Sequence, residues 1–284
     1  MTLRHNSPAW SWQFASDAIR KLPRLHPFED ITPAWAWNGS TGRGVRVAVI
    51  DSGIDATHPA IGGVHGYAAI IEGSDCLDID TAPHADLYGH GTACAGIIRA
   101  AAPDCELFSV RVLGSRLTAT GAVFTAAIRW AIDHEMHVCN LSLGTTKKDF
   151  FAPLHELTDL AYHRNIMLVT AANNMPIPSF PSTYASVFSV AAHGEPNSSS
   201  FFYNPDPPVE FGAPGIEVRV PWQNGGWISA TGNSFAAPYI TGLIARILAK
   251  HPGLTVFQMK SILRALAANV ATDAPAERPA QPPR

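Results

Sequence analysis

Three short segments of this chain each place a residue suited to nucleophilic catalysis beside glycines. Asp51 ends the apolar run VRVAVID, His90 lies in GHGTACAG, and Ser234 lies in ATGNSFAAP. A serine hydroxyl becomes a good nucleophile when a base takes its proton, and a carboxylate can hold that base in the required tautomer. The three residue types therefore predict acyl transfer, with Ser234 as the nucleophile, His90 as the base and Asp51 as the orienting group.

Each of these residues has a competitor or an alternative interpretation. Asp55 follows Asp51 by four residues, but Asp51 ends the predicted strand, and we expect Asp55 to form a turn or a cap. Among the twelve histidines, His90 is flanked by glycines that allow a tight turn and close approach of a substrate, and His84 is a distant second candidate. Ser234 has the alternative of an ordinary helix N-cap.

In the order Asp, His, Ser, the segments resemble the subtilisin-like serine peptidases over roughly residues 33–268. Gly232 and Pro238 match the family, and an N-cap role for Ser234 would explain neither of them. The resemblance implies an α/β protein, three-layer α/β/α with a mostly parallel central sheet, and hydrolysis of peptide bonds through an acyl-enzyme. An α/β-hydrolase esterase is disfavoured, because its G-x-S-x-G motif is absent at Ser234 and its serine would precede the Asp and the His.

The resemblance also implies an oxyanion donor and a substrate cleft. The pattern after VTAA gives Asn174 the role of side-chain donor to the oxyanion, with Asn173 where relatives usually have glycine. An extended peptide would pair with an edge segment and contact a facing wall. The substrate-binding residues implied in this way are Ser142, Leu143 and Gly144 on the edge, Ala171, Ala172 and Asn173 on the wall, and Asp86 beside the cleft. A solvated loop acid is the alternative for Asp86, and Asn173 favours a pocket narrower or more polar than in relatives of broad specificity.

The chain departs from the family pattern at points that bear on function. Asn233 stands where relatives usually have a small residue, often threonine, and the helix from His90 continues without the calcium-binding loop of many secreted relatives. An acidic group could hold Ca²⁺, but we expect a solvated acidic loop formed by Glu72, Asp75, Asp78 and Asp80. We therefore expect no metal and no cofactor. Asn173 and Asn233 keep open a rival function, a catalytically silent scaffold that binds peptides.

From residue 44 onward, short apolar runs alternate with helical patterns, which favours a parallel sheet with helices on both faces. We expect strands over 45–51, 106–113, 137–144, 165–173 and 187–194, and helices over 120–134, 153–164, 234–250 and 256–267. Residues 31–270 then form one peptidase domain. An N-terminal arm over 1–30 either packs on it or masks the cleft, and the Pro- and Ala-rich residues 271–284 predict a disordered tail.

The composition argues against several classes of partner. With a net charge of −3, the 284-residue chain has no electrostatic footprint for nucleic acid or an anionic membrane, and no apolar run is long enough to span a bilayer. The first residues lack the apolar core of a signal peptide, and the four cysteines have no metal-type spacing. We therefore expect a cytoplasmic enzyme with free thiols that acts on a peptide or protein substrate, and a regulatory protein partner is compatible with this composition. Cys94, one helical turn after His90, is expected to be a small buried side chain.

Overall fold

The structure is a computed structural model of the chain, and it describes residues 16–21, 31–73, 76–195 and 200–270. Contacts within the chain divide it into two units, Met1–Ile31 and Thr32–Arg284. In the first unit, the described residues contain the short helix α1 (Ser16–Ile19). Most of the expected arm over 1–30 and the whole of the expected tail over 271–284 lie outside the described residues, so both stay predictions.

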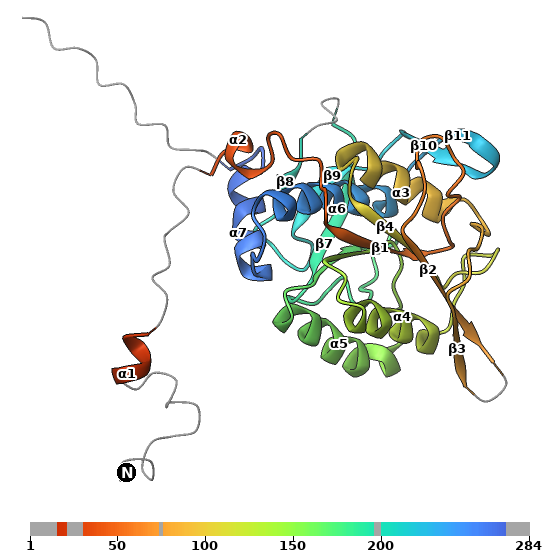
Figure 1. The fold of residues 1–284 in the computed structure, drawn as a ribbon, viewed down its shortest axis with the longest axis horizontal. Helices are drawn as coiled ribbons and strands as arrows, with labels where there is room; N and C mark the ends of the chain where they lie inside the picture. The colour runs from red at the N-terminus through yellow and green to blue at the C-terminus, as the bar shows by residue number, and fades with distance from the viewer. Residues whose placement is uncertain (1–15, 22–30, 74–75, 196–199, 271–284) are drawn as a thin grey trace, which may run out of the picture. The chain divides into compact units, whose positions relative to one another are not determined.

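The second unit is organised around a sheet that, within the described residues, has nine strands (Figure 1). Their order across the sheet is β3-β2-β4-β1-β5-β6-β7-β9-β8. The strands from β2 to β9 in this order pair in parallel, and the edge strands β3 and β8 pair antiparallel. The bounds of the strands are β1 Arg46–Asp51, β2 Gly66–Glu72, β3 Leu77–Asp80, β4 Glu106–Arg111, β5 Val138–Leu141, β6 Met167–Ala171, β7 Phe188–His193, β8 Phe202–Tyr203 and β9 Phe211–Pro214.

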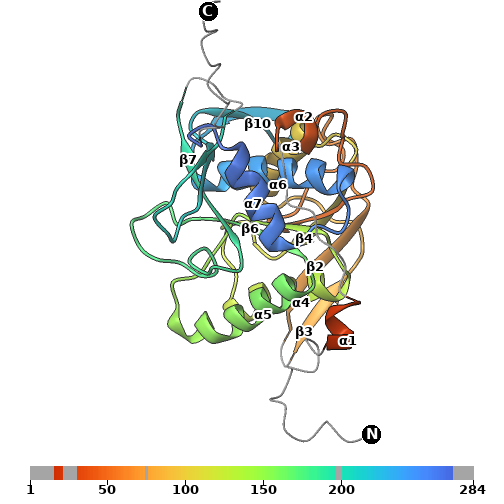
Figure 2. The same ribbon diagram turned by 90° about the vertical axis from the view of Figure 1, so that its left-hand side faces the viewer.

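Helices cover both faces of this sheet (Figures 1 and 2). Helices α3 (His90–Ala101) and α6 (Asn233–Lys250) pack on one face, and α4 (Gly121–Asp133) and α5 (Phe151–His163) pack on the other. The expected three-layer α/β/α fold with a mostly parallel sheet is therefore confirmed. Among the described helices, none combines the length and the apolarity that crossing a membrane requires.

Smaller elements complete the second unit. Helix α2 (Pro33–Ala36) contacts α6, and α7 (Val256–Leu266) contacts β8. A two-stranded antiparallel sheet of β10 (Val218–Trp222) and β11 (Gly226–Ala230) lies against α3 through β10. The contact between α3 and β10 matters for the site, because α3 begins at the candidate base.

Burial explains why the central strands were recognisable as continuous apolar runs. All residues of β5 and β6 are buried, as are the last five residues of β1. A parallel sheet between two helix layers needs strands that are apolar on both faces. The predicted strands and helices all occur, with bounds that differ by a few residues.

The topology brings the catalytic candidates to the side of the sheet where the parallel strands have their carboxyl ends. Strands β1, β5 and β6 are parallel neighbours, so the carboxyl ends of all three lie at the same edge. Asp51 is the last residue of β1, while α3 begins at His90 and α6 begins at Asn233. In open α/β sheets, the crevice at the carboxyl ends of the strands is where ligands bind.

The acidic group expected in a solvated loop belongs instead to an edge hairpin. Strands β2 and β3 pair antiparallel and carry Glu72, Asp78 and Asp80, all three exposed. Asp75 lies outside the described residues. The expectation of a loop is therefore wrong for the three described members, and charges on an edge strand discourage pairing with another chain.

Candidate active site

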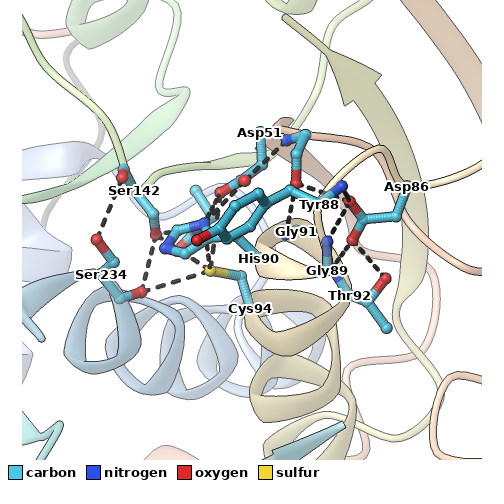
Figure 3. A network of polar contacts seen from close by, with 12 residues as sticks. Asp51, Asp86, Tyr88, Gly89, His90, Gly91, Thr92, Cys94, Ser142 and Ser234 are labelled. Carbon is cyan, nitrogen blue, oxygen red and sulfur yellow. Dashed lines mark hydrogen bonds and ion pairs between the residues drawn. The ribbon is translucent and has the colours of Figure 1, made fainter. Parts of the chain in front are cut away.

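Asp51 and His90 form a hydrogen-bonded pair at the edge of the sheet (Figure 3). Asp51 is fully buried, and its two carboxylate oxygens lie 2.8 and 2.9 Å from His90 Nδ1. The backbone N–H of Ser52 also donates to Asp51 Oδ1, at 2.7 Å. When Nδ1–H donates to the carboxylate, Nε2 is the ring nitrogen left to accept a proton. The pair therefore has the arrangement of a general base held by an orienting carboxylate.

The surroundings of His90 favour its protonated form. Burial by itself lowers the pKa of His90, whose side chain is 12% exposed, but the Asp51 carboxylate acts against it by charge and by hydrogen bonding. The net effect raises the pKa of His90 well above 6.5. The imidazolium that forms when the serine proton is taken is thus stabilised where it is produced.

The start of α3 approaches β1 too closely for any side chain at position 91. A Cβ on Gly91 would lie 2.0 Å from the carbonyl oxygen of Gly53 and 3.1 Å from Asp51 Cβ. Gly89, on the other side of the base, has a φ of 112° in the left-handed region. The two glycines that flank His90 thus permit the turn and the close approach by which it reaches Asp51.

Asp86 anchors this helix start from within the protein. It is 7% exposed, and its two oxygens accept five hydrogen bonds of 2.6 to 2.9 Å. A carboxylate is favoured beside the first turn of a helix, where N–H groups have no intrahelical partner. The five donors are Ser52 Oγ, Tyr88 N, Gly89 N, Thr92 N and Thr92 Oγ1. The expectation that Asp86 contacts substrate is therefore corrected to a buried helix cap, because its bonding capacity is taken up inside the protein.

Ser234 lies in the first turn of α6 and lines the same cavity as His90. Its hydroxyl donates to the Ser142 carbonyl oxygen over a long 3.3 Å (Figure 3). The contact that catalysis needs, from Ser234 Oγ to His90 Nε2, is a different one, and such contacts are often long or poorly aligned until substrate binds. Pro238 has no N–H to bond the Ser234 carbonyl, and this oxygen instead accepts from Ser142 Oγ at 2.9 Å. Ser142 therefore contacts both the side chain and the backbone of the nucleophile.

Cys94 lies beneath the Asp51–His90 pair (Figure 3). Its buried Sγ is 3.8 Å from Asp51 Oδ2, 3.9 Å from His90 Nδ1 and 3.4 Å from the Ser234 carbonyl oxygen. Burial raises the pKa of the Cys94 thiol, so the neutral form persists. The expectation of a small buried side chain is confirmed, as is that of four free cysteines.

Asn174 lines the same cavity as Ser234. Its Oδ1 accepts the backbone N–H of Asn233 at 2.9 Å, which fixes the orientation of the amide and leaves Nδ2 as the donor. The backbone N–H of Ser234 is a second donor, since it belongs to a helix first turn. This geometry suits an oxyanion hole of one side-chain and one backbone donor. The role of Asn174 stays a prediction that the geometry supports.

A cavity of about 610 Å³ passes these residues. Of the expected substrate contacts, Ser142, Leu143 and Gly144 line it. Its walls also include apolar side chains that the sequence did not single out, namely Tyr88, Leu113, Leu117, Phe124, Trp222 and Phe235. The signal that could have found some of them is position, because Leu113 and Leu117 follow β4 at its carboxyl end.

The expected facing wall does not line this cavity. Ala171 is buried at the end of β6, and the carbonyl oxygens of Ala172 and Asn173 both accept from the Asn233 side chain at 3.1 Å. Asn173 Oδ1 accepts from the Met175 backbone N–H at 2.9 Å, within its own turn. Of the described residues that line the cavity, none is from 171–173. The structure thus gives these three residues a supporting position.

The competing candidates have other roles. Asp55 Oδ1 accepts from the backbone N–H and the hydroxyl of Thr57, at 3.0 and 2.6 Å, so it is a turn residue as expected. His84 Nε2 contacts Ser109 Oγ at 2.9 Å. Burial, together with the nearby Arg111, lowers the pKa of His84 to about 4. His84 is therefore a neutral structural residue.

A metal has one candidate set of ligands in the described part of the chain. The ligand atoms of Asp51, His90 and Cys94 lie within 4.8 Å of one another. The carboxylate of Asp51 and Nδ1 of His90 already form the hydrogen bond that orients the general base, so a metal bound to these atoms would break that hydrogen bond. The set therefore fits an inhibitory ion better than a resident cofactor.

Comparison with known proteins identifies the family. The family model described as "Subtilase family" matches residues 42–280. The chain belongs to the subtilase family. The motif-based expectation is confirmed, and the family is one of serine endopeptidases. This subtilase is 31% identical over 243 residues to M-protease of Shouchella clausii (strain KSM-K16), and the match covers 82% of the chain and 61% of M-protease.

Two further relatives show how far the likeness extends. Subtilisin Savinase of Lederbergia lenta is 31% identical over 243 residues, covering 82% of this subtilase and 86% of the relative. The crystal structure of a cold adapted subtilisin-like serine proteinase superposes with a TM-score of 0.66 at 24% identity, covering 87% of each chain. At that identity, the structural likeness establishes the fold alone.

Proposed function

We propose that this subtilase is an active serine endopeptidase that cleaves a peptide or protein substrate through an acyl-enzyme on Ser234. One observation carries the proposal: the Asp51–His90 pair, with contacts of 2.8 and 2.9 Å, faces the cavity that Ser234 also lines. A hydroxyl, a base and an orienting carboxylate in one cleft are the groups that acyl transfer needs.

The proposed reaction has two stages, acylation of Ser234 and hydrolysis of the acyl-enzyme, and the same residues serve both. Ser234 Oγ attacks the substrate carbonyl carbon while His90 Nε2 takes the hydroxyl proton, and Asp51 stabilises the imidazolium. The carbonyl oxygen becomes an oxyanion that accepts from Asn174 Nδ2 and the Ser234 backbone N–H. His90 then gives its proton to the leaving amine as the C–N bond breaks. Water, activated by the same base, releases the acid and restores Ser234.

We also propose that the enzyme works in the cytoplasm, on a limited set of sites. Free thiols at Cys76, Cys94, Cys105 and Cys139 support a reducing compartment. Unrestricted proteolysis would damage a cell, so cleft shape or a regulatory protein partner would limit it. The bulky apolar walls of the cavity support such selectivity. Fractionation of the producing cells tests the location: recovery in the cytoplasm is expected, and recovery in the medium would contradict it.

Cleavage profiling of a proteome-derived peptide library by mass spectrometry tests the activity. The expected result is a restricted set of cleavages by the wild-type protein and none by Ser234→Ala. If folded wild-type protein cleaves nothing, the peptide-binding scaffold becomes the better account. The narrow or polar pocket was expected from Asn173, which does not line the cavity. A profile dominated by large apolar residues before the cleaved bond would agree with the apolar walls and overturn that expectation.

A further inference from the structure

Asn233, directly before the nucleophile, uses its side chain to join three segments of the fold. Its Oδ1 accepts the backbone N–H of Ala192 at 2.8 Å, near the end of β7. Its Nδ2 donates to the carbonyl oxygens of Ala172 and Asn173, both at 3.1 Å, in the connection that follows β6. The side chain therefore ties the start of α6 to the segment that carries Asn174 and to the neighbouring strand.

The backbone of Asn233 continues the same set of contacts. Its N–H donates to Asn174 Oδ1 at 2.9 Å, so one residue holds both the amide of Asn174 and the backbone on which Asn174 is carried. The next residue is Ser234, whose own N–H is the second proposed oxyanion donor. Any shift of Asn233 would therefore change the distance between the two donors.

From these contacts, we infer that Asn233 is a positioning residue that sets the geometry of the oxyanion hole. The inference rests on the proposed function, because it assigns Asn233 a role through Asn174. Oxyanion donors act when they are held in place before the charge develops, and a misplacement of about 1 Å can cost about 100-fold in rate. The energetic role of Asn233 is to prevent that misplacement.

The chemistry of the contacts explains why asparagine suits this position. Two donated bonds and one accepted bond match the two amide hydrogens and the carbonyl oxygen of its side chain. Aspartate has the same shape but cannot donate, and it would place a carboxylate against the carbonyls of Ala172 and Asn173. Threonine has a single hydroxyl and can replace one donated bond at most.

A double-mutant cycle with Asn174→Ala tests the inference. In the wild-type background, Asn233→Asp and Asn233→Ala are expected to lower kcat about 10- to 100-fold while KM changes less than about two-fold. In the Asn174→Ala background, the same changes are expected to lower kcat less than about three-fold, because the donor they position is already gone. Asn233→Thr is expected to lie between wild type and Asn233→Ala, and it provides a second variant if Asn233→Asp does not fold.

A transition-state analogue separates positioning from a loss of stability. A peptide aldehyde forms a hemiacetal with the serine and uses the oxyanion hole, so its Ki is expected to rise as kcat/KM falls. The matched control is Asn204→Asp. Asn204 also donates two bonds to backbone carbonyls, at 2.7 and 2.8 Å, and accepts one backbone N–H, at 3.0 Å, in an exposed turn. Its replacement is expected to leave kcat and the Ki unchanged.

The outcomes distinguish the inference from the proposal beneath it. If Asn174→Ala keeps near full turnover, the oxyanion assignment of the proposed function is wrong, and the inference falls with it. If Asn174→Ala loses turnover but the Asn233 variants leave kcat unchanged, or lower it equally in both backgrounds, the inference alone is overturned. A rise in KM with constant kcat would likewise overturn it.

Discussion

Replacement of Asp86 by asparagine removes one charge from the buried cap of α3 and keeps its shape. The carboxylate accepts five hydrogen bonds, three on Oδ1 and two on Oδ2. An amide must place its NH₂ group on one of these sides. The less damaging choice is the Oδ2 side, where the Thr92 hydroxyl can rotate to accept, but the Thr92 backbone N–H then faces another donor.

The expected loss in free energy of unfolding can be worked out from these five hydrogen bonds. One buried backbone N–H left without a partner costs about 1–3 kcal/mol. The bonds that remain lose their charge assistance, which makes such bonds roughly twice as strong as neutral ones. We therefore expect the free energy of unfolding to fall by about 2–4 kcal/mol. For a domain of this size, that corresponds to a fall in Tm of about 5–15 °C.

Thermal unfolding followed by circular dichroism is the assay, carried out in a Ser234→Ala background so that self-cleavage cannot contribute. Asp55→Asn is the matched control, because Asp55 also accepts a backbone N–H and a hydroxyl, but on Oδ1 alone in a surface turn that asparagine can reproduce. The control should change Tm by less than about 2 °C. If Asp86→Asn is equally mild but alters KM in the active enzyme, Asp86 contacts substrate and our reassignment of it is wrong.

Three further predictions follow from the site. Only neutral His90 accepts the serine proton, and Asp51 raises the pKa of His90 above 6.5. The value of kcat/KM should therefore rise with pH along an acid limb centred above pH 6.5. An acid limb centred at or below pH 6.5 would refute the electrostatic argument. Because Cys94 is buried and burial raises its pKa, an organomercurial should modify the exposed Cys76 and leave kcat/KM unchanged. A loss of activity that Cys94→Ala prevents and Cys76→Ser does not would instead show that the reagent reaches Sγ, 3.9 Å from His90 Nδ1. Because we expect no bound Ca²⁺, a chelator should shift the Tm of Ser234→Ala by less than about 2 °C. Loss of a tightly bound ion would lower the free energy of unfolding by several kcal/mol. A fall in Tm of many degrees would therefore show a calcium site that we did not expect.

The parts of the fold that the sequence made predictable are those with strong local signals. Strands β1 and β6 are buried on both faces, so their apolar runs stand out against the flanking segments. The edge hairpin of β2 and β3 gave no such signal, because β3 is largely exposed and its acidic residues resemble a loop. The hairpin of β10 and β11 was missed for a similar reason, since several of its residues face solvent.

The catalytic residues were recognisable because each motif is local. His90 sits beside a glycine that a close approach requires, as the 2.0 Å contact of a Cβ at Gly91 shows. Ser234 follows Gly232 by two residues at the start of α6. The role of Asp86 was not recognisable because the turn before α3 is what brings its four nearby donors, all within six residues, onto one carboxylate. The role of Asn233 was not recognisable because its side-chain partners are distant in sequence. Ser52 is 34 residues from Asp86, and Ala172 is 61 residues from Asn233. A carboxylate that caps a helix and one that contacts substrate look the same until those partners are placed.

Reaction with a fluorophosphonate tests the central claim most directly, because that claim is that His90 activates Ser234. Peptide mapping of the labelled protein by mass spectrometry should find one adduct, on Ser234, formed faster as the pH rises through the pKa of His90. The adduct should be absent from Ser234→Ala and formed far more slowly by His90→Ala. Folded wild-type protein that takes up no label, or that is labelled on another residue, would contradict the assignment of nucleophile and base.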